Sequence, residues 1–175
     1  MKIELGRYPN KGKRKMNIKI DKWDSWNMDG TLSPIILPLL KQLQATKHGA
    51  PNVDDTDVPD ELKSTSAPPT ENDWETDDNH FKRWDWVLEQ MIWSFEQLIK
   101  DNYDSLYHHG KSDYDWVETD KLYPNPITGK MEKTFQMIDK DPNSHWYDSE
   151  GNKLHEDRIQ EGLELFGKYY RALWD

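Results

Sequence analysis

The chain has no cysteine among its 175 residues, and this absence excludes disulfide bonds and thiolate chemistry. No apolar run approaches the roughly 20 residues that a membrane-spanning helix needs. The first residues, MKIELGRYPNKGKRK, lack the apolar core of a secretion signal. We therefore expect no membrane span, and the default compartment is the cytosol.

Apolar residues are also scarce, at 34% of the chain, whereas aromatic residues reach 12%. Nine Trp and eight Tyr must therefore supply much of the core, because each buries a large area with one polar atom attached. The length predicts one domain over residues 1–175. Residues 50–78, which are acidic and rich in proline, read as a long loop inserted into it.

The net charge of -10 is unevenly distributed. Between Lys2 and Lys22, eight bases against two acids leave a local charge of +6. Between Asp54 and Asp78, ten acids against one base leave -9. Nonspecific nucleic-acid binding depends on neutralising phosphates along an extended surface, so this balance predicts no such role for the chain as a whole.

A first β-hairpin is predicted at the N-terminal end, where apolar and polar residues alternate over 2–8 and again over 16–23. The turn between them, PNKGKRK, is basic. Its Lys13 and Arg14 are candidates for binding an anion. The alternative is a solvated turn that keeps a sheet edge soluble.

Three segments carry the 3.6-residue apolar period of a helix, roughly residues 31–47, 79–102 and 155–174. In the first, Pro38 is expected to kink or break the helix. In the last, Gly162 on the apolar face indicates close approach by another backbone. The middle helix is the centre of the predicted core, with one face formed by Phe81, Trp84, Leu88, Met91, Ile92, Phe95 and Ile99.

A second hairpin is predicted over residues 119–138, around the turn PNPITGK. Together these elements predict an α+β fold with three main helices, short antiparallel β-hairpins and long polar loops.

The middle helix has a second, narrower stripe formed by Trp86 and Trp93, with Lys82, Arg83 and Lys100 nearby. Aromatic faces can stack a base while Lys or Arg neutralises phosphate, so these five residues are candidate ligand-binding residues. The alternative is that the two tryptophans are core or dimer contacts. Because the helix is apolar on two sides, we expect a homo-oligomer.

Acidic residues also raise the question of a metal. Asp139, Asp141, Asn143 and Glu150 fall on ligand positions of an EF-hand calcium loop. However, Ser144 replaces the glycine of that loop and Pro142 stiffens it. We expect a coincidental acidic turn, and neither a metal nor a cofactor.

Three segments carry a resemblance to a known family: residues 23–62 (WDSWNMDG to DVPDEL), 80–97 (HFKRWDWVLEQMIWSFEQ) and 165–175 (LFGKYYRALWD). They resemble a family of small tailed-bacteriophage proteins that are mostly described as hypothetical. The resemblance implies a viral protein made in the cytoplasm of an infected bacterium. It brings no catalytic motif with it.

Three functions are consistent with these observations. The first is non-enzymatic counter-defence, in which the protein sequesters a small anionic nucleotide signal or a host protein; phage proteins that trap such signals offer an analogy. The second is a structural or interaction protein for virion assembly or host takeover. The third is a metal-dependent phosphoesterase, whose first candidates are Asp24, Asp29, His48 and His80. The chain shows no nucleophile elbow, phosphate-binding loop or zinc pair, so we expect binding rather than catalysis.

Overall fold

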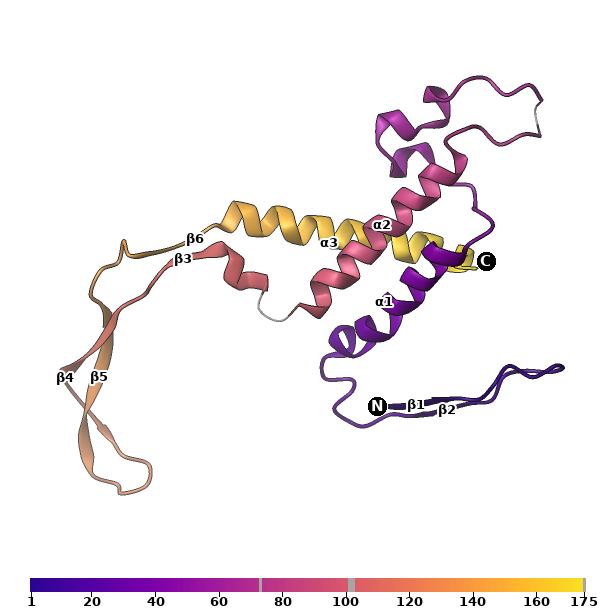
Figure 1. Cartoon of the computed structure of the whole chain (residues 1–175). Coiled ribbons are helices and arrows are strands. Elements are labelled where there is room, and N and C mark those ends of the chain that lie inside the picture. The colour runs from indigo at the N-terminus through magenta and orange to yellow at the C-terminus, as the bar shows by residue number, and fades with distance from the viewer. Residues whose placement is uncertain (73, 101–102, 175) are drawn as a thin grey trace. The chain divides into compact units, whose positions relative to one another are not determined.

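The computed structural model describes residues 1–72, 74–100 and 103–174, and its contacts separate into two compact units. Unit 1 comprises Met1–Asp101 with His155–Asp175, and unit 2 comprises Asn102–Leu154. The described residues form three long helices and three antiparallel strand pairs, which confirms the predicted α+β fold (Figure 1).

Helix α2 (His80–Ile99) forms the centre of unit 1, as predicted. Trp84, Val87, Leu88 and Met91 are completely buried along it. The two ends of the predicted apolar face are more open than expected, since Phe81 is 49% exposed and Ile99 is 38% exposed. The buried face is therefore shorter and wider than the apolar stripe.

Helix α1 (Met28–Thr46) packs against α2 and places Leu40 in the core. Asn27 caps its start, because the Asn27 side chain accepts a hydrogen bond from the Gly30 amide at 3.2 Å. The helix is continuous through Pro38, so the break expected there does not occur. Proline removes one backbone hydrogen bond of the helix, and α1 keeps its packing against α2.

Helix α3 (Ser149–Tyr169) begins earlier than predicted and is followed by a short 3-10 turn, η5 (Tyr170–Ala172). A β-carbon built on Gly162 lies 2.0 Å from Ser94 Oγ and 2.7 Å from the Gln90 carbonyl oxygen. Only glycine permits this approach of α3 to α2. The prediction from Gly162 is confirmed.

The acidic segment (residues 54–78) contains three short 3-10 turns: η1 (Asp55–Asp57), η2 (Asp60–Leu62) and η3 (Ser64–Ser66). Val53 and Val58, which are both buried, attach its beginning to the core. Trp74, near the end of the segment, is 82% exposed. Much of the segment is thus fixed by local turns and by a few apolar contacts.

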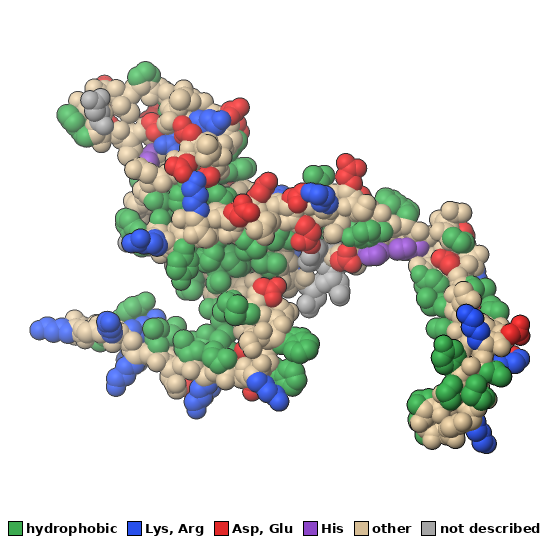
Figure 2. All heavy atoms as spheres, turned by 180° about the vertical axis from the view of Figure 1, so that it is seen from behind, with side chains coloured by type: hydrophobic (Ala, Val, Ile, Leu, Met, Phe, Trp, Pro, Cys, Tyr) green, Lys and Arg blue, Asp and Glu red, His purple; other side chains and the backbone are tan. Residues whose placement is uncertain are grey.

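Two strand pairs are hairpin ribbons, whose strands are joined by residues 6–15 and 125–130. The β1–β2 ribbon pairs β1 (Lys2–Leu5) with β2 (Met16–Lys19), and the β4–β5 ribbon pairs β4 (Tyr114–Pro124) with β5 (Met131–Asp139). The third pair is shorter and joins β3 (His108–Gly110) to β6 (His145–Tyr147). Figure 2 shows hydrophobic side chains along both ribbons and Lys and Arg side chains along β1–β2.

Candidate functional site

The basic residues predicted to bind a ligand on α2 all interact with their own chain. Lys82 donates to the Asn79 side chain at 3.0 Å, and Lys100 donates to the Gln97 side chain at 3.0 Å. Arg83 is buried, and its guanidinium donates two hydrogen bonds to the Asp77 carboxylate, at 2.9 and 2.6 Å.

Hydrogen bonds from the buried Arg83 guanidinium lower the pKa of Asp77. The Asp77 carboxylate in turn raises the pKa of Arg83. Arg83 also donates to the Leu62 carbonyl oxygen at 3.1 Å. This residue therefore anchors the acidic segment to α2. The sequence suggested Arg83 as a ligand-binding residue because a helical pattern does not show which residues outside the helix its side chain contacts.

The second stripe of α2 is covered by α3. The Arg158 guanidinium lies 3.8 Å from the centroid of the Trp93 ring, and the His155 ring lies 5.2 Å from it. Trp86 is half-buried and packs against the core. The two tryptophans thus have neighbours within the chain, and they no longer supply a reason to expect a second copy.

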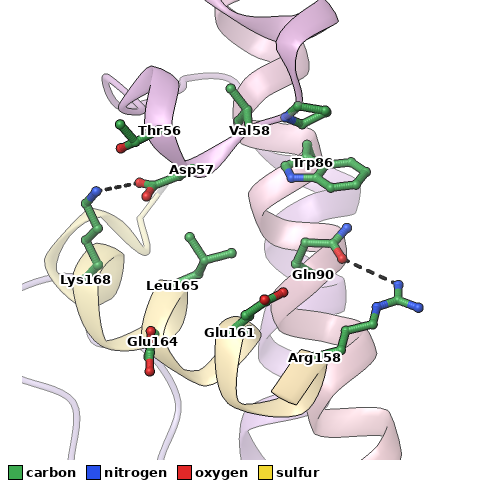
Figure 3. Close-up of a pocket in the computed structure, with 12 residues that line it drawn as sticks. Thr56, Asp57, Val58, Trp86, Gln90, Arg158, Glu161, Glu164, Leu165 and Lys168 are labelled. Carbon is green, nitrogen blue, oxygen red and sulfur yellow. Dashed lines mark hydrogen bonds and ion pairs between the residues drawn. The ribbon is translucent and has the colours of Figure 1, made fainter. Parts of the chain in front are cut away.

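A groove lies between α2, α3 and the start of the acidic segment, with a volume of about 550 Å³ (Figure 3). We call it the α2–α3 groove. Trp86 and Gln90 line it from α2, and Val58 and Pro59 line it from the acidic segment. The α3 side contributes apolar Leu165 and a row of charged side chains: Arg158, Glu161, Glu164 and Lys168.

The two cationic side chains that line the groove, Lys168 and Arg158, already have partners within the chain. Lys168 Nζ lies 2.6 Å from both Asp54 Oδ2 and Asp57 Oδ2, and these carboxylates raise the pKa of Lys168. At the other end, Arg158 donates to the Gln90 side chain at 3.5 Å while covering Trp93. Figure 3 shows these two contacts at opposite ends of the groove.

Two carboxylates on the α3 side, Glu161 and Glu164, lie between these ends and are exposed. Counting Asp57, the lining holds three acids against two bases. A phosphate would meet more negative than positive charge there. The groove is better suited to a cationic group that can also contact an indole.

Tyr169 hydrogen-bonds to the acidic segment at the end of the groove where Lys168 lies. Its hydroxyl donates to Asp57 Oδ2 at 2.5 Å and accepts from the Asp54 amide at 3.0 Å. Burial raises the pKa of Tyr169 to about 12, with the Asp57 hydrogen bond as the second cause. The phenol therefore stays protonated at neutral pH and holds the acidic segment against α3.

The candidate metal ligands of unit 2 serve local turns. Asp139 accepts from the Asp141 amide at 3.0 Å, and Asp141 accepts from the Asn143 amide at 3.2 Å. Glu150 lies in the first turn of α3. Within the described residues, no group of three or more His, Asp or Glu is placed to hold a metal ion.

The catalytic candidates are separated rather than gathered. Asp24 pairs with the N-terminal ammonium at 2.6 Å, which lowers the pKa of Asp24, and Asp29 lies in the first turn of α1. His48 follows the other end of that helix, about 28 Å away at 1.5 Å per residue. His80 is buried, and its ring contacts the Ala50 carbonyl oxygen at 3.1 Å.

The basic tip of the β1–β2 ribbon (residues 9–15) has a fixed turn and free cations. Arg14 donates to the Gly6 carbonyl oxygen at 2.5 Å and lies 4.4 Å from the centroid of the Tyr8 ring. Lys13 is exposed, as are Lys11 and Lys15. None of the three lysines forms an ion pair with an acidic residue in the described part of the chain.

The β4–β5 ribbon has one strongly apolar face. Residues opposite each other in an antiparallel pair share a face, as do alternate residues of one strand. The register therefore gathers six large side chains, each between 48% and 64% exposed, on one face: Tyr114, Trp116, Leu122, Met131, Phe135 and Met137. In the part of unit 2 that the structure describes, β4 and β5 pack extensively only against each other, so this face stays open.

The apolar face was not predicted, although the alternation of Met131, Phe135 and Met137 along β5 was a usable signal. Comparison with protein-family models, curated proteins and solved structures found no match. Among the described residues, no helix has the length and apolarity to cross a membrane.

Proposed function

We propose that this chain is a non-enzymatic structural and interaction protein that assembles with copies of itself through the apolar face of the β4–β5 ribbon. The observation that supports it is the row of six large, half-exposed apolar side chains on a two-stranded ribbon. A two-stranded hairpin is marginally stable alone in water, so a ribbon of this length is stabilised when its apolar face is covered.

A second copy is the cover that we propose, because two such faces match each other in chemistry and length. Faces that pack at about 10 Å form a small sandwich with an apolar centre. Two charged residues in the middle of this face, Glu118 and Lys133, already form an ion pair with each other. They therefore require no charged group from the partner.

The apolar area of this face gives a free energy that can be compared with the cost of association. Full burial of a large apolar side chain contributes about 1.5–3 kcal/mol, so covering six half-exposed side chains contributes on the order of 5–9 kcal/mol per ribbon. Two facing ribbons contribute about twice that amount, against an association cost of roughly 4–15 kcal/mol. The apolar gain is therefore of the same order as the cost of association and exceeds it over most of the two ranges.

The resemblance to tailed-phage proteins supports a setting for this role: the cytoplasm of an infected bacterium, in virion assembly or host takeover. Sequestration of a nucleotide signal has less support. Arg83 forms an ion pair with Asp77. Lys82 and Lys100 donate hydrogen bonds to Asn79 and Gln97. The groove beside Trp86 carries more acids than bases.

The test compares two exposed aromatic residues on opposite faces of the same ribbon. Trp116 is 64% exposed on the apolar face, and Tyr123 is 65% exposed on the other face. We expect Trp116→Ser combined with Phe135→Ser to weaken self-association at least 100-fold in sedimentation velocity, whereas Tyr123→Ser leaves it within a few-fold. If the double variant and Tyr123→Ser weakened self-association equally, the apolar face would not be the interface.

A further inference from the structure

We infer that the basic tip of the β1–β2 ribbon of one copy docks in the α2–α3 groove of another copy, where its lysines contact Trp86, Glu161 and Glu164. This inference rests on the proposed self-assembly and adds a second contact that joins different surfaces. The first observation that supports it is that the lysines of the tip, Lys11, Lys13 and Lys15, are exposed and none forms an ion pair with a described acidic residue.

The second observation is the chemistry of the groove. Its lining combines apolar side chains, Trp86, Val58 and Leu165, with the exposed carboxylates of Glu161 and Glu164. A lysine has an apolar stem and a cationic end, so it can contact both kinds of surface at once. Two turns along α2, Trp93 already holds the Arg158 guanidinium at 3.8 Å, which shows an indole of this helix accepting a cation.

Charge complementarity extends beyond the groove itself. The acidic segment that forms one wall carries ten acids against one base, and the N-terminal 22 residues carry eight bases against two acids. Opposite fields of this kind direct two copies toward a head-to-tail encounter. The volume of about 550 Å³ lies within the range of ordinary ligand-binding clefts.

The geometry of such a contact has a consequence for the assembly. A tip on one copy and a groove on the next are different surfaces, so each copy offers one of each. Head-to-tail contacts of this type close into rings or extend into filaments, whereas the ribbon face makes pairs. If the tips and grooves are exchanged between the same two copies, both contacts fit within one dimer; if they join different copies, the assembly is larger than a dimer.

Cysteine cross-linking tests this directly, because the chain has no cysteine of its own. One full-length variant carries Lys13→Cys and a second carries Glu161→Cys, and the two are mixed under mild oxidation. A matched control replaces Glu161→Cys with Gly167→Cys, an exposed position on α3 outside the groove lining with open space at its β-carbon. We expect at least tenfold more mixed disulfide with Glu161→Cys than with Gly167→Cys, and less of it at high salt.

Charge exchange provides a second measurement. Lys11, Lys13 and Lys15 are changed to Glu in one variant, and Glu161 and Glu164 are changed to Lys in another. We expect each variant to weaken head-to-tail association about tenfold at low salt, and a mixture of the two to restore it in part. Arg14 is left unchanged because it holds the turn.

Several outcomes overturn the inference. An oligomer by mass that gives equal cross-linking at both α3 positions would reject tip docking and leave the proposed assembly intact. A monomer at all concentrations would reject both. An internal disulfide in one chain carrying both Lys13→Cys and Glu161→Cys at high dilution would place the tip in its own groove. Binding of a labelled DNA duplex that depends on the tip lysines, without cross-linking, would assign the tip to nucleic acid.

Discussion

Replacing Gly162 with alanine places a methyl group where α3 approaches α2 most closely. The added β-carbon lies 2.0 Å from Ser94 Oγ, 2.8 Å from Ser94 Cβ and 2.7 Å from the Gln90 carbonyl oxygen. Ser94 is completely buried, so its side chain has little room to rotate away. The Gln90 oxygen belongs to the α2 backbone, so α3 must move away until the contact is longer than 3.0 Å.

Overpacking of this kind costs about 1–3 kcal/mol. Alanine in a helix interior recovers about 1 kcal/mol relative to glycine. Because the two effects oppose each other, we expect Gly162→Ala to lower the free energy of unfolding by up to about 2 kcal/mol. It also separates α3 from Trp93, which Arg158 of α3 covers.

The matched control is Gly167→Ala on the same helix. No heavy atom lies within 4 Å of a β-carbon built there, so only the helix-propensity gain applies. We expect this variant to be more stable than the parent by about 0.5–1 kcal/mol. Urea unfolding followed by tryptophan fluorescence measures both variants. Equal stability of Gly162→Ala and Gly167→Ala would refute the close packing of α2 and α3.

Further predictions concern the contacts that hold the acidic segment. Because the pKa of Asp77 is lowered in the fold, its pairing with Arg83 stabilises the protein above the ordinary carboxylate pKa near 4 and is lost as the pH falls below it. Asp77→Asn should cost about 2–3 kcal/mol at pH 7, less than breaking a fully buried pair because Asp77 keeps some contact with water. It should also flatten the acid limb of a stability–pH profile; an unchanged limb would mean that another group sets it. Tyr169→Phe removes the hydrogen bonds to Asp57 and Asp54, so we expect a loss of about 1–2 kcal/mol in chemical unfolding. The same variant should speed hydrogen exchange at the Asp54 amide, and unchanged exchange there would contradict this contact.

Local patterns were sufficient to predict much of the fold. The helical period located all three long helices, and the alternation of apolar residues located both ribbons. Gly162 even indicated a helix contact, because a residue without a side chain on an apolar helix face leaves room for a second backbone. These features depend on residues a few positions apart, which the sequence displays directly.

The candidate site was harder to predict because its contacts join distant segments. Arg83 reads as an exposed base on a helical wheel, yet it is buried and donates to Asp77, just before the helix, and to the Leu62 carbonyl oxygen, in an earlier segment. The cover over Trp93 comes from Arg158, far along the chain. The single-domain prediction and the oligomeric state stay predictions.

The molar mass of the full chain in solution tests the central claim most directly. One chain has a mass of 20.9 kDa. Light scattering coupled to size-exclusion chromatography, over a range of loading concentrations, should give a dimer or a larger multiple of that mass for the unmodified protein. A mass of 20.9 kDa at every concentration, with no partner protein bound, would contradict assembly through the β4–β5 ribbon.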